Sequence, residues 1–482
     1  MTSDKIRMVF FCAFLGLFSG CNDEAEDVPA SSDDKELGEA IAAHQLKGDP
    51  FKDKKLPGIN DPVVQLGKDL FFSKVLSGNR DTACVSCHHP VLGGGDGLSL
   101  SIGVDAEVAD LLGPGRFHRS DAQHHDGGPT VPRNAPTTFN IAAWEDVLFH
   151  DGRLETLSDN EIRTPDVGLG IADIQAGENL VHAQARFPVT SLEEMKGFSL
   201  GDKSNQETRD FLAQRMGGYG DAAGLLEYPD FWLEKFRTAF KEPAATSDEL
   251  ITEQNISFSI SEYERSQRFT ETPWKYYVEG DNAAISEGAK KGALLFFRPV
   301  ADGGANCASC HSGDFFTDEK FHNIAMPQIG RGKGDGDGSE DLGRFRETKK
   351  AKDRYAFRTP TLLNVEMTGP WGHSGAYSSL EGVIRHHLDA EAALANYDFS
   401  QLSQPGIQNL DKMYSNTRKA LDDPGFDLEV VDLSDEDVGY LVEFMKSLTD
   451  PCVKDRKCLA PWIADGESDS DPNGDQLNAI GL

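Results

Sequence analysis

Two short stretches, Cys84-Val85-Ser86-Cys87-His88 and Cys307-Ala308-Ser309-Cys310-His311, decide how this chain folds. Both follow the C-x-x-C-H pattern of covalent haem attachment. Two thiols one short turn apart can each bond a haem vinyl group, and the adjacent histidine can then reach the iron. A zinc site would need a second pair of ligands at finger-like spacing, and a redox dithiol would not need a histidine after each pair. The sequence therefore predicts two haem c groups, with His88 and His311 as iron ligands.

The repeat extends upstream of the cysteines. Gly67 is followed by Leu70-Phe71-Phe72, and Gly292 is followed at the same offsets by Leu295-Phe296-Phe297. Both runs have apolar residues at helical spacing, and an apolar helix that leads into C-x-x-C-H is typical of a small cytochrome c domain. We therefore expect a mainly α fold of two cytochrome c-like haem domains with long loops and little β structure. The predicted domains are residues 57–275 and 276–450.

The N-terminus has the features of an export signal. Lys5 and Arg7 precede an apolar run from Met8 to Phe18, which is too short to span a bilayer. Leu17-Phe18-Ser19-Gly20-Cys21 is similar to a bacterial lipobox, and the alternative is an ordinary cleaved signal with an incidental cysteine. We expect residues 1–21 to be a lipoprotein-type signal peptide and residues 22–56 a flexible acidic tether. The protein would then lie on the periplasmic side as a membrane-anchored lipoprotein.

Composition narrows the class of partner. The 482 residues carry a formal charge of −33, and 38% of them are hydrophobic. This length can bury more than one core. The acidic balance excludes nucleic acid and an anionic membrane surface as partners, because both require a basic face.

Four further stretches suggest a family. With the two haem motifs they resemble the di-haem cytochrome c peroxidase and MauG superfamily, over about Asp61 to Leu448. The stretches are Arg133-Asn134-Ala135-Pro136-Thr137, Asp151-Gly152-Arg153, Gln184-Ala185 through Glu194-Met195, and Phe357-Arg358-Thr359-Pro360-Thr361 through His373.

The resemblance implies that the N-terminal haem, on His88, is the peroxide-reactive one. Many members place an iron-binding histidine at the end of a Ser-x-Gly-His stretch, and this chain has Val104 in Ser101-Ile102-Gly103-Val104. Valine cannot bind iron, so we expect an open iron without reductive activation. The alternative is a replacement ligand from the nearby polar insert, which contains His118, His124 and His125.

The family's distal acid/base pair matches Gln184 and Glu194 in this chain, with Pro188 between them. A raised carboxyl pKa beside an apolar haem face would suit this role. Two alternatives remain open. Glu194 could instead form a helix capping box with Ser191, and Glu193 could be the catalytic carboxylate.

The resemblance also places the other axial ligand of the second haem at His387, fourteen residues after His373. Helical phase favours the same residue, because His387 shares a face with the apolar Leu380, Val383 and Ile384, whereas His386 falls on a more polar side. The alternative is a helix-end histidine that interacts with the dipole. Ligation by two imidazoles would make this haem low-spin, closed to peroxide and suited to electron transfer.

Other features are implied by the family or by local pattern. A calcium ion between the domains would be held by the Asn134 side chain and the carbonyls of Thr368 and Pro370, unless Asn134 only shapes a turn. The inter-haem tryptophan of the family is replaced by His150, with Trp144 and Trp371 as candidate substitutes. We expect Arg133, Arg153 and Arg358 to pair with haem propionates or, alternatively, to form surface ion pairs. We expect residues Gly330 to Asp341 to form a mobile surface loop. In the tail over residues 451–482 we expect a disulfide loop between Cys452 and Cys458 and a flexible end after Trp462.

The sequence thus predicts a di-haem peroxidase that reduces hydrogen peroxide to water with electrons from a small c-type cytochrome or copper protein. One alternative is a MauG-like oxidase that modifies residues of a partner protein. The other is a di-haem electron-transfer protein without turnover of its own. Family members often form dimers, so a homodimer is a possible assembly.

Overall fold

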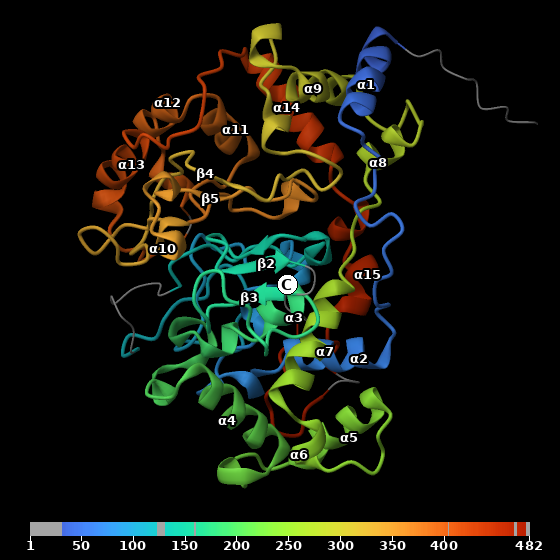
Figure 1. Cartoon of the computed structure of the whole chain (residues 1–482), viewed down its shortest axis with the longest axis vertical. Helices are drawn as coiled ribbons and strands as arrows, with labels where there is room; N and C mark the ends of the chain where they lie inside the picture. The colour runs from blue at the N-terminus through green and yellow to red at the C-terminus, as the bar shows by residue number, and fades with distance from the viewer. Residues whose placement is uncertain (1–30, 123–130, 159–160, 403, 467–469, 479–482) are drawn as a thin grey trace, which may run out of the picture.

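The computed structural model of the chain describes residues 31–122, 131–158, 161–402, 404–466 and 470–478. These residues are mainly helical, as expected, with long connections and two small antiparallel sheets (Figure 1). The sheets have the orders β1-β2-β3 and β4-β5. The helices are α1 (Ser32–Ala43), α2 (Pro62–Phe71), α3 (Leu180–Ala185), α4 (Asn205–Gly217), α5 (Pro229–Phe240), α6 (Ser247–Leu250), α7 (Glu253–Arg265), α8 (Pro273–Val278), α9 (Glu287–Phe297), α10 (Phe345–Thr348), α11 (Leu380–Leu388), α12 (Ala390–Ala395), α13 (Met413–Leu421), α14 (Asp435–Ser447) and α15 (Arg456–Leu459). The strands are β1 (Val147–Leu148), β2 (Leu154–Ser158), β3 (Glu161–Arg163), β4 (Phe321–His322) and β5 (Phe357–Arg358).

Each haem motif follows a helix that crosses a partner helix at close range. Helix α2 packs on α7 and helix α9 packs on α14. The glycine of the sequence repeat lies at each crossing. A Cβ atom added to Gly67 would be 1.9 Å from the carbonyl oxygen of Ser259, and one added to Gly292 would be 2.0 Å from that of Tyr440. Both glycines are therefore required by the close approach of two backbones.

The helix pairs organise two main cores. The first surrounds α2, α4, α5 and α7, and we call these helices with the Cys84–His88 motif the first unit. The second surrounds α9 and α14 with α1 and α8. These helices, the Cys307–His311 motif and the chain from that motif to α14 form the second unit. Figure 1 shows the first unit below and the second above, with β2, β3 and α3 between them. Residues of β1, β2, β3 and α3 pack into the second core although they precede it in the chain.

The segment 31–56 is not a flexible tether. Helix α1 packs against α9, with Leu37 fully buried. The carboxylate of Asp34 lies 2.9 Å from the ammonium of Lys290, and the carboxylate of Asp314 accepts hydrogen bonds from the backbone amides of Lys47 and Gly48. The acidic composition suggested a solvated chain, but the apolar face of α1 and these pairings attach it to the second unit. Residues 22–30 lie outside the described residues, as does the expected signal over residues 1–21.

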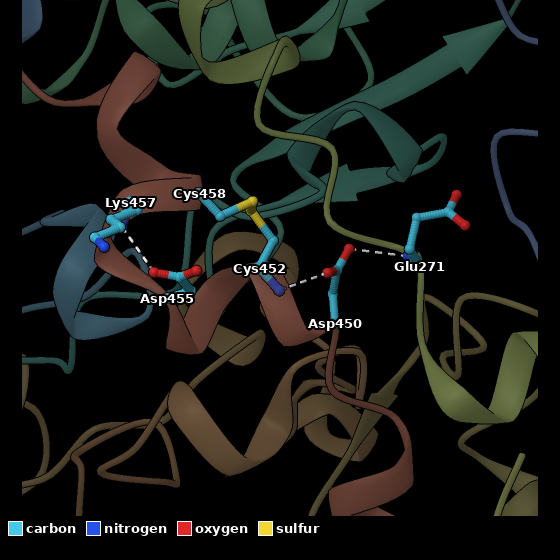
Figure 2. The surroundings of a disulfide bond; sticks show 6 residues. All are labelled: Glu271, Asp450, Cys452, Asp455, Lys457 and Cys458. Atoms are coloured by element: carbon cyan, nitrogen blue, oxygen red, sulfur yellow. Dashed lines mark hydrogen bonds between the residues drawn. A yellow bond between two sulfur atoms is a disulfide. The ribbon is translucent and has the colours of Figure 1, made fainter.

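The C-terminal segment returns to the first unit. The predicted disulfide between Cys452 and Cys458 is present, and the carboxylate of Asp450 beside it accepts hydrogen bonds from the amides of Cys452 (2.8 Å) and Glu271 (2.9 Å) (Figure 2). Figure 1 shows α15 beside α7 and α2.

The expectation of a flexible end is wrong for residues 470–478. Leu477 is buried in the first core, and its amide donates to the carbonyl of Phe72 (2.8 Å). The buried carboxylate of Asp475 pairs with Arg80 at 2.8 Å. One apolar side chain and one buried ion pair fix a segment whose Gly/Asp/Ser composition suggests a solvated chain. Across the described ranges, no helix combines the length and the apolar character that a membrane crossing requires.

Candidate haem sites

The first motif opens into a buried cavity. Cys84, Cys87 and His88 line it, and it encloses about 1030 Å³ with its mouth included. Residues 84–86 form a single turn, and the His88 amide donates to the Cys84 carbonyl (3.0 Å). The His88 Nδ1 atom lies 3.2 Å from the carbonyl of Gly94, so this nitrogen donates and Nε2 remains for a metal. Burial lowers the pKa of His88, which keeps the ring in the neutral form that a ligand needs.

The lining of this cavity fits a covalently attached haem. Cys84 and Cys87 are free thiols, and so are Cys307 and Cys310 in the second motif. The Gln184 Oε1 and Glu264 Oε2 atoms are buried without a hydrogen-bond partner in the described structure, although both residues line the cavity. Buried polar atoms are seldom left unpaired, so a polar group that enters the cavity would satisfy them.

Gln184 and Glu194, the expected acid/base pair, both line the first cavity. Gln184 lies on α3, and Glu194 on a single π-helical turn from Leu192 to Lys196, a geometry frequent at functional sites. Burial raises the pKa of Glu194, while the charges of Arg153 and Lys333 oppose that rise. The capping-box alternative is wrong, because the Ser191 side chain does not cap this turn. Glu193 is not among the lining residues.

The stretch Ser101–Val104 packs directly behind this π-helical turn. A Cβ atom at Gly103 would be 2.2 Å from the carbonyl oxygen of Glu193 and 2.9 Å from the Cα of Glu194, so only glycine allows the approach. The Val104 amide donates to the Glu193 carbonyl (3.2 Å). Val104 is buried and does not line the cavity, and neither does His118. His124 and His125 lie outside the described residues.

The second motif faces a histidine from α11. The ring centroids of His311 and His387 are 6.3 Å apart, close to the separation imposed by one metal ion bonded to a nitrogen of each ring at about 2 Å. Both Nδ1 atoms are near backbone carbonyls: that of Phe316 for His311 (3.1 Å) and that of Val383 for His387 (2.8 Å). Each ring therefore keeps Nε2 for iron.

His386 is engaged elsewhere and does not fit an iron ligand. Its Nδ1 lies 2.9 Å from the hydroxyl of Tyr377, and its Nε2 lies 2.9 Å from the carbonyl of Ile324. The residue is fully buried, and burial lowers its pKa to about 3. The more polar helix face that sequence phase assigned to His386 is thus covered by Tyr377, and the geometry favours His387 as the axial ligand.

A buried charge network joins the two units. The guanidinium of Arg133 binds the carboxylate of Asp341 through two hydrogen bonds (2.7 and 2.9 Å) and lies 2.7 Å from that of Asp151. Arg133 therefore has two protein carboxylates as partners, and its pairing with a haem propionate stays a prediction. Arg153 pairs with Asp151 (3.2 Å), and Arg358 lies over the Trp144 ring at 3.4 Å. These three arginines all line the first cavity.

The loop Gly330–Asp341 reaches the surface in its middle but is anchored at its C-terminal end. Ser339, Glu340 and Asp341 are buried, and Tyr355 donates to the Glu340 carboxylate (2.8 Å). Gly330, Gly332 and Gly334 adopt positive φ, so the glycines that suggested mobility serve a fixed turn instead. The loop also carries Lys333 into the lining of the first cavity.

The sequence did not predict two charged residues that line the first cavity, Lys333 and Glu264. Lys333 comes from the second unit, and the alternation Gly-Arg-Gly-Lys-Gly was the only signal for it in the sequence. Glu264 comes from α7, an amphipathic helix, and no motif in the sequence distinguishes it from the other polar residues of that helix. Burial raises the pKa of Glu264 to about 8.

The region between the sites contains aromatic and imidazole rings. His150 lines the first cavity, with its Nε2 3.0 Å from the Asn134 carbonyl, and burial lowers its pKa to about 3. Trp144 lines the same cavity and meets Phe315 edge-on at 5.1 Å. Phe315 directly precedes Phe316, whose carbonyl contacts His311. Trp371 bonds to the Val365 carbonyl (3.0 Å) and is not part of the cavity lining.

The expected calcium ligands lie on neighbouring segments. The Asn134 amide nitrogen donates to the carbonyls of Leu98 and Ser99, which directs the side-chain oxygen elsewhere. The backbone amide of Asn134 donates to the carbonyl of His373 (2.9 Å), three residues after Pro370. The Gly369–Pro370 peptide bond is cis. Calcium binding itself stays a prediction.

Comparison with known proteins agrees with this geometry. Residues 61–283 match the family model described as di-haem cytochrome c peroxidase. The methylamine utilization protein MauG of Methylorubrum extorquens is 29% identical over 352 residues, which are 72% of this chain and 75% of MauG. The cytochrome c551 peroxidase of Pseudomonas aeruginosa is 26% identical over 369 residues, 76% of this chain and 79% of the relative.

Solved structures support the fold. A MauG-like protein associated with microbial copper homeostasis superposes with a TM-score of 0.55 at 20% identity, covering 84% of this chain and 96% of the other. The diheme peroxidase BthA from Burkholderia thailandensis gives a TM-score of 0.52 at 19% identity, with 83% and 89% coverage. The matched family model, these relatives and the paired haem motifs all relate this chain to the di-haem cytochrome c peroxidase and MauG family.

Proposed function

We propose that this protein reduces hydrogen peroxide to water at its first haem site, with electrons that a small c-type cytochrome or copper protein delivers through the second. The observation that carries the proposal is that Gln184 and Glu194 line the same buried cavity as Cys84, Cys87 and His88. A haem bound there supplies an iron that accepts an oxygen ligand and exchanges electrons.

The chain's own residues provide the proton chemistry. The Glu194 carboxyl, with its raised pKa, can take a proton from one oxygen of peroxide and return it to the other as the O–O bond breaks. The buried amide of Gln184 can hold the peroxide by a hydrogen bond to its unpartnered Oε1. The absence of an imidazole at position 104 leaves these two side chains free to act without a ligand exchange.

The second site is proposed to transfer electrons. His311 and His387, whose rings face each other, would both bind its iron, and an iron held by two imidazoles would transfer electrons and not react with peroxide. We also propose that Asn134, Thr368 and Pro370 hold a calcium ion, and that the protein is exported and carries a lipid at Cys21.

The test is the reaction of the diferric protein with peroxide in the presence of a reduced cytochrome. Glu194→Gln and Gln184→Ala should slow donor oxidation by about 10²–10⁴-fold while both haems stay attached. Glu242→Gln is the matched control, because this carboxylate is exposed and does not line the cavity. Equal rates in the Glu194→Gln variant and the control would refute the assignment.

The second candidate is a MauG-like oxidase that acts on a residue of a partner protein. It is favoured by an imidazole in place of a thioether at position 387, since thioether ligation raises the haem potential, and by the relationship to MauG of Methylorubrum extorquens. Fast reaction with peroxide but poor oxidation of every small redox protein offered would favour this function over the peroxidase. Protein without any reaction with peroxide would instead be an electron carrier.

A further inference from the structure

The second unit contributes a cation to the first cavity. Lys333 lies in the loop Gly330–Asp341 and lines that cavity. Two ion pairs hold the loop in place, one before Lys333 in the sequence and one after it. Before it, Arg331 pairs with Glu193 at 2.7 Å. After it, Asp341 forms the buried pair with Arg133. The Lys333 amide also donates to the Glu340 carbonyl (3.0 Å), which closes the loop between the two anchors.

The ammonium of Lys333 differs from the other cations around the cavity. Arg133 is neutralised by Asp151 and Asp341, and Arg153 shares Asp151. In the described part of the chain, the Lys333 side chain has neither a hydrogen bond nor an ion pair of its own. Burial, with Arg153 and Arg133 nearby, lowers its pKa to about 8, so it still carries most of its charge at neutral pH.

The electrostatic surroundings of Glu194 contain few charges. Arg153 and Lys333 favour its ionised form, Glu193 opposes it, and a hydrogen bond from Ser191 favours it. Arg153 is partly compensated by Asp151, and Glu193 is compensated by Arg331. Lys333 lies near Asp151 and Asp341, which favour its charged form, but both of these carboxylates are paired with Arg133. Among the cations that act on Glu194, Lys333 is thus the one that forms no ion pair in the described part of the chain.

We infer that Lys333 is a positioning residue for the first site: its charge, delivered by the second unit, keeps the Glu194 carboxylate available as a proton acceptor inside an otherwise desolvating cavity. The inference rests on the proposed function and deepens it. The proton that leaves one oxygen of peroxide passes to Glu194 and returns to the other oxygen, which departs as water. The remaining oxygen becomes a second water with two electrons from the donor protein and two protons from solvent, so Glu194 ends ionised as it began.

The inference is tested by cyanide binding to the first haem of the diferric protein, followed by absorption as a function of pH. Hydrogen cyanide, like peroxide, must release a proton to a base when it binds, and it requires no turnover. The rate of cyanide binding should decline at low pH, where Glu194 is protonated; we call this decline the acid limb. Lys333→Met should move the acid limb to higher pH by about one unit, so that the rate at a pH below it falls roughly tenfold. Lys333→Arg should restore the wild-type profile.

Two controls give the result its meaning. Lys350→Met removes an exposed lysine of the same unit and should leave the profile unchanged. In a Glu194→Gln background the limb should be absent, and Lys333→Met should add no shift. A Lys333→Met profile identical to that of Lys350→Met would overturn the inference, and so would a shift that persists without Glu194. Peroxide turnover is scored separately: normal turnover with an unshifted profile refutes only the role of Lys333, whereas a shifted profile without turnover refutes only the peroxidase.

Discussion

The clearest prediction concerns the helix crossing of the second unit. Gly292→Ala places a Cβ atom 2.0 Å from the carbonyl oxygen of Tyr440, where ordinary contact begins at 3.4 Å. The overlap is between two backbones, so no side-chain rotation can relieve it, and α9 and α14 must separate by about 1.4 Å. Overpacking costs about 1–3 kcal/mol, and an overlap between backbones lies at the upper end of that range.

The matched control is Gly439→Ala in α14, one residue before Tyr440. A Cβ atom there meets nothing within 4 Å. Alanine is better than glycine in a helix by about 1 kcal/mol, and this gain applies to both variants. We therefore expect Gly292→Ala to lower the free energy of unfolding by about 2 kcal/mol and Gly439→Ala to raise it by up to about 1 kcal/mol.

The assay is urea unfolding of the protein with both haems attached, followed by far-ultraviolet circular dichroism and by haem absorption. Gly292→Ala should also perturb the low-spin spectrum of the second haem, because α9 leads directly into its attachment motif. Gly67→Ala, with its Cβ atom 1.9 Å from the Ser259 carbonyl oxygen, should perturb the first haem instead. If Gly292→Ala were as stable as Gly439→Ala, the close crossing would not be a determinant of the fold.

Three further outcomes follow from the same geometry. His387→Ala should make the second haem high-spin, whereas His386→Ala should leave it low-spin; an electron paramagnetic resonance spectrum separates the two. Arg133→Met leaves the buried Asp341 carboxylate without its cation and Asp151 with Arg153 alone, and should cost about 3–5 kcal/mol at neutral pH in urea unfolding. Since Arg133 holds the pKa of Asp341 below its ordinary value, the stability of the wild type should fall as acid protonates that group, and the difference between wild type and variant should shrink. Burial raises the pKa of Glu264 to about 8 from an ordinary value near 4.5, so between these pH values the native state retains a proton that the unfolded chain releases. The free energy of unfolding should therefore fall as pH rises through this range, by up to about 1.4 kcal/mol per pH unit. Glu264→Gln should reduce this pH dependence, and equal slopes in the variant and the wild type would refute the prediction.

Much of the architecture could be predicted from the sequence because it depends on local pattern. The C-x-x-C-H motifs and the Gly…Leu-Phe-Phe repeat specify a helix, a turn and a pair of thiols within a short stretch of chain. Helical phase predicted His387 and not His386 as the iron ligand of the second haem. The hydrogen bonds agree with this choice, because Nε2 of His386 contacts a backbone carbonyl, whereas in His387 only Nδ1 does.

What sequence reasoning missed depends on distant contacts. Lys333 and Glu264 face the first cavity only because the tertiary fold brings their segments there. The Gly330–Asp341 loop, the segment 31–56 and residues 470–478 were all expected to be mobile, since their composition is polar or glycine-rich. Each is fixed by buried ion pairs, backbone hydrogen bonds or single apolar residues such as Leu37 and Leu477, whose partners are hundreds of residues away. Composition measures average polarity and does not reveal such pairings.

The return of the C-terminal segment to the first unit has a consequence for biogenesis. Phe72 receives its hydrogen bond from Leu477, and Tyr263 donates to the Trp462 carbonyl (2.7 Å), so the first core includes residues that are synthesised long after its haem motif. Domains usually fold in order of synthesis. Here the N-terminal haem motif would emerge well before these packing partners, so its cysteines would remain accessible to the attachment machinery until residues 462–477 have been made.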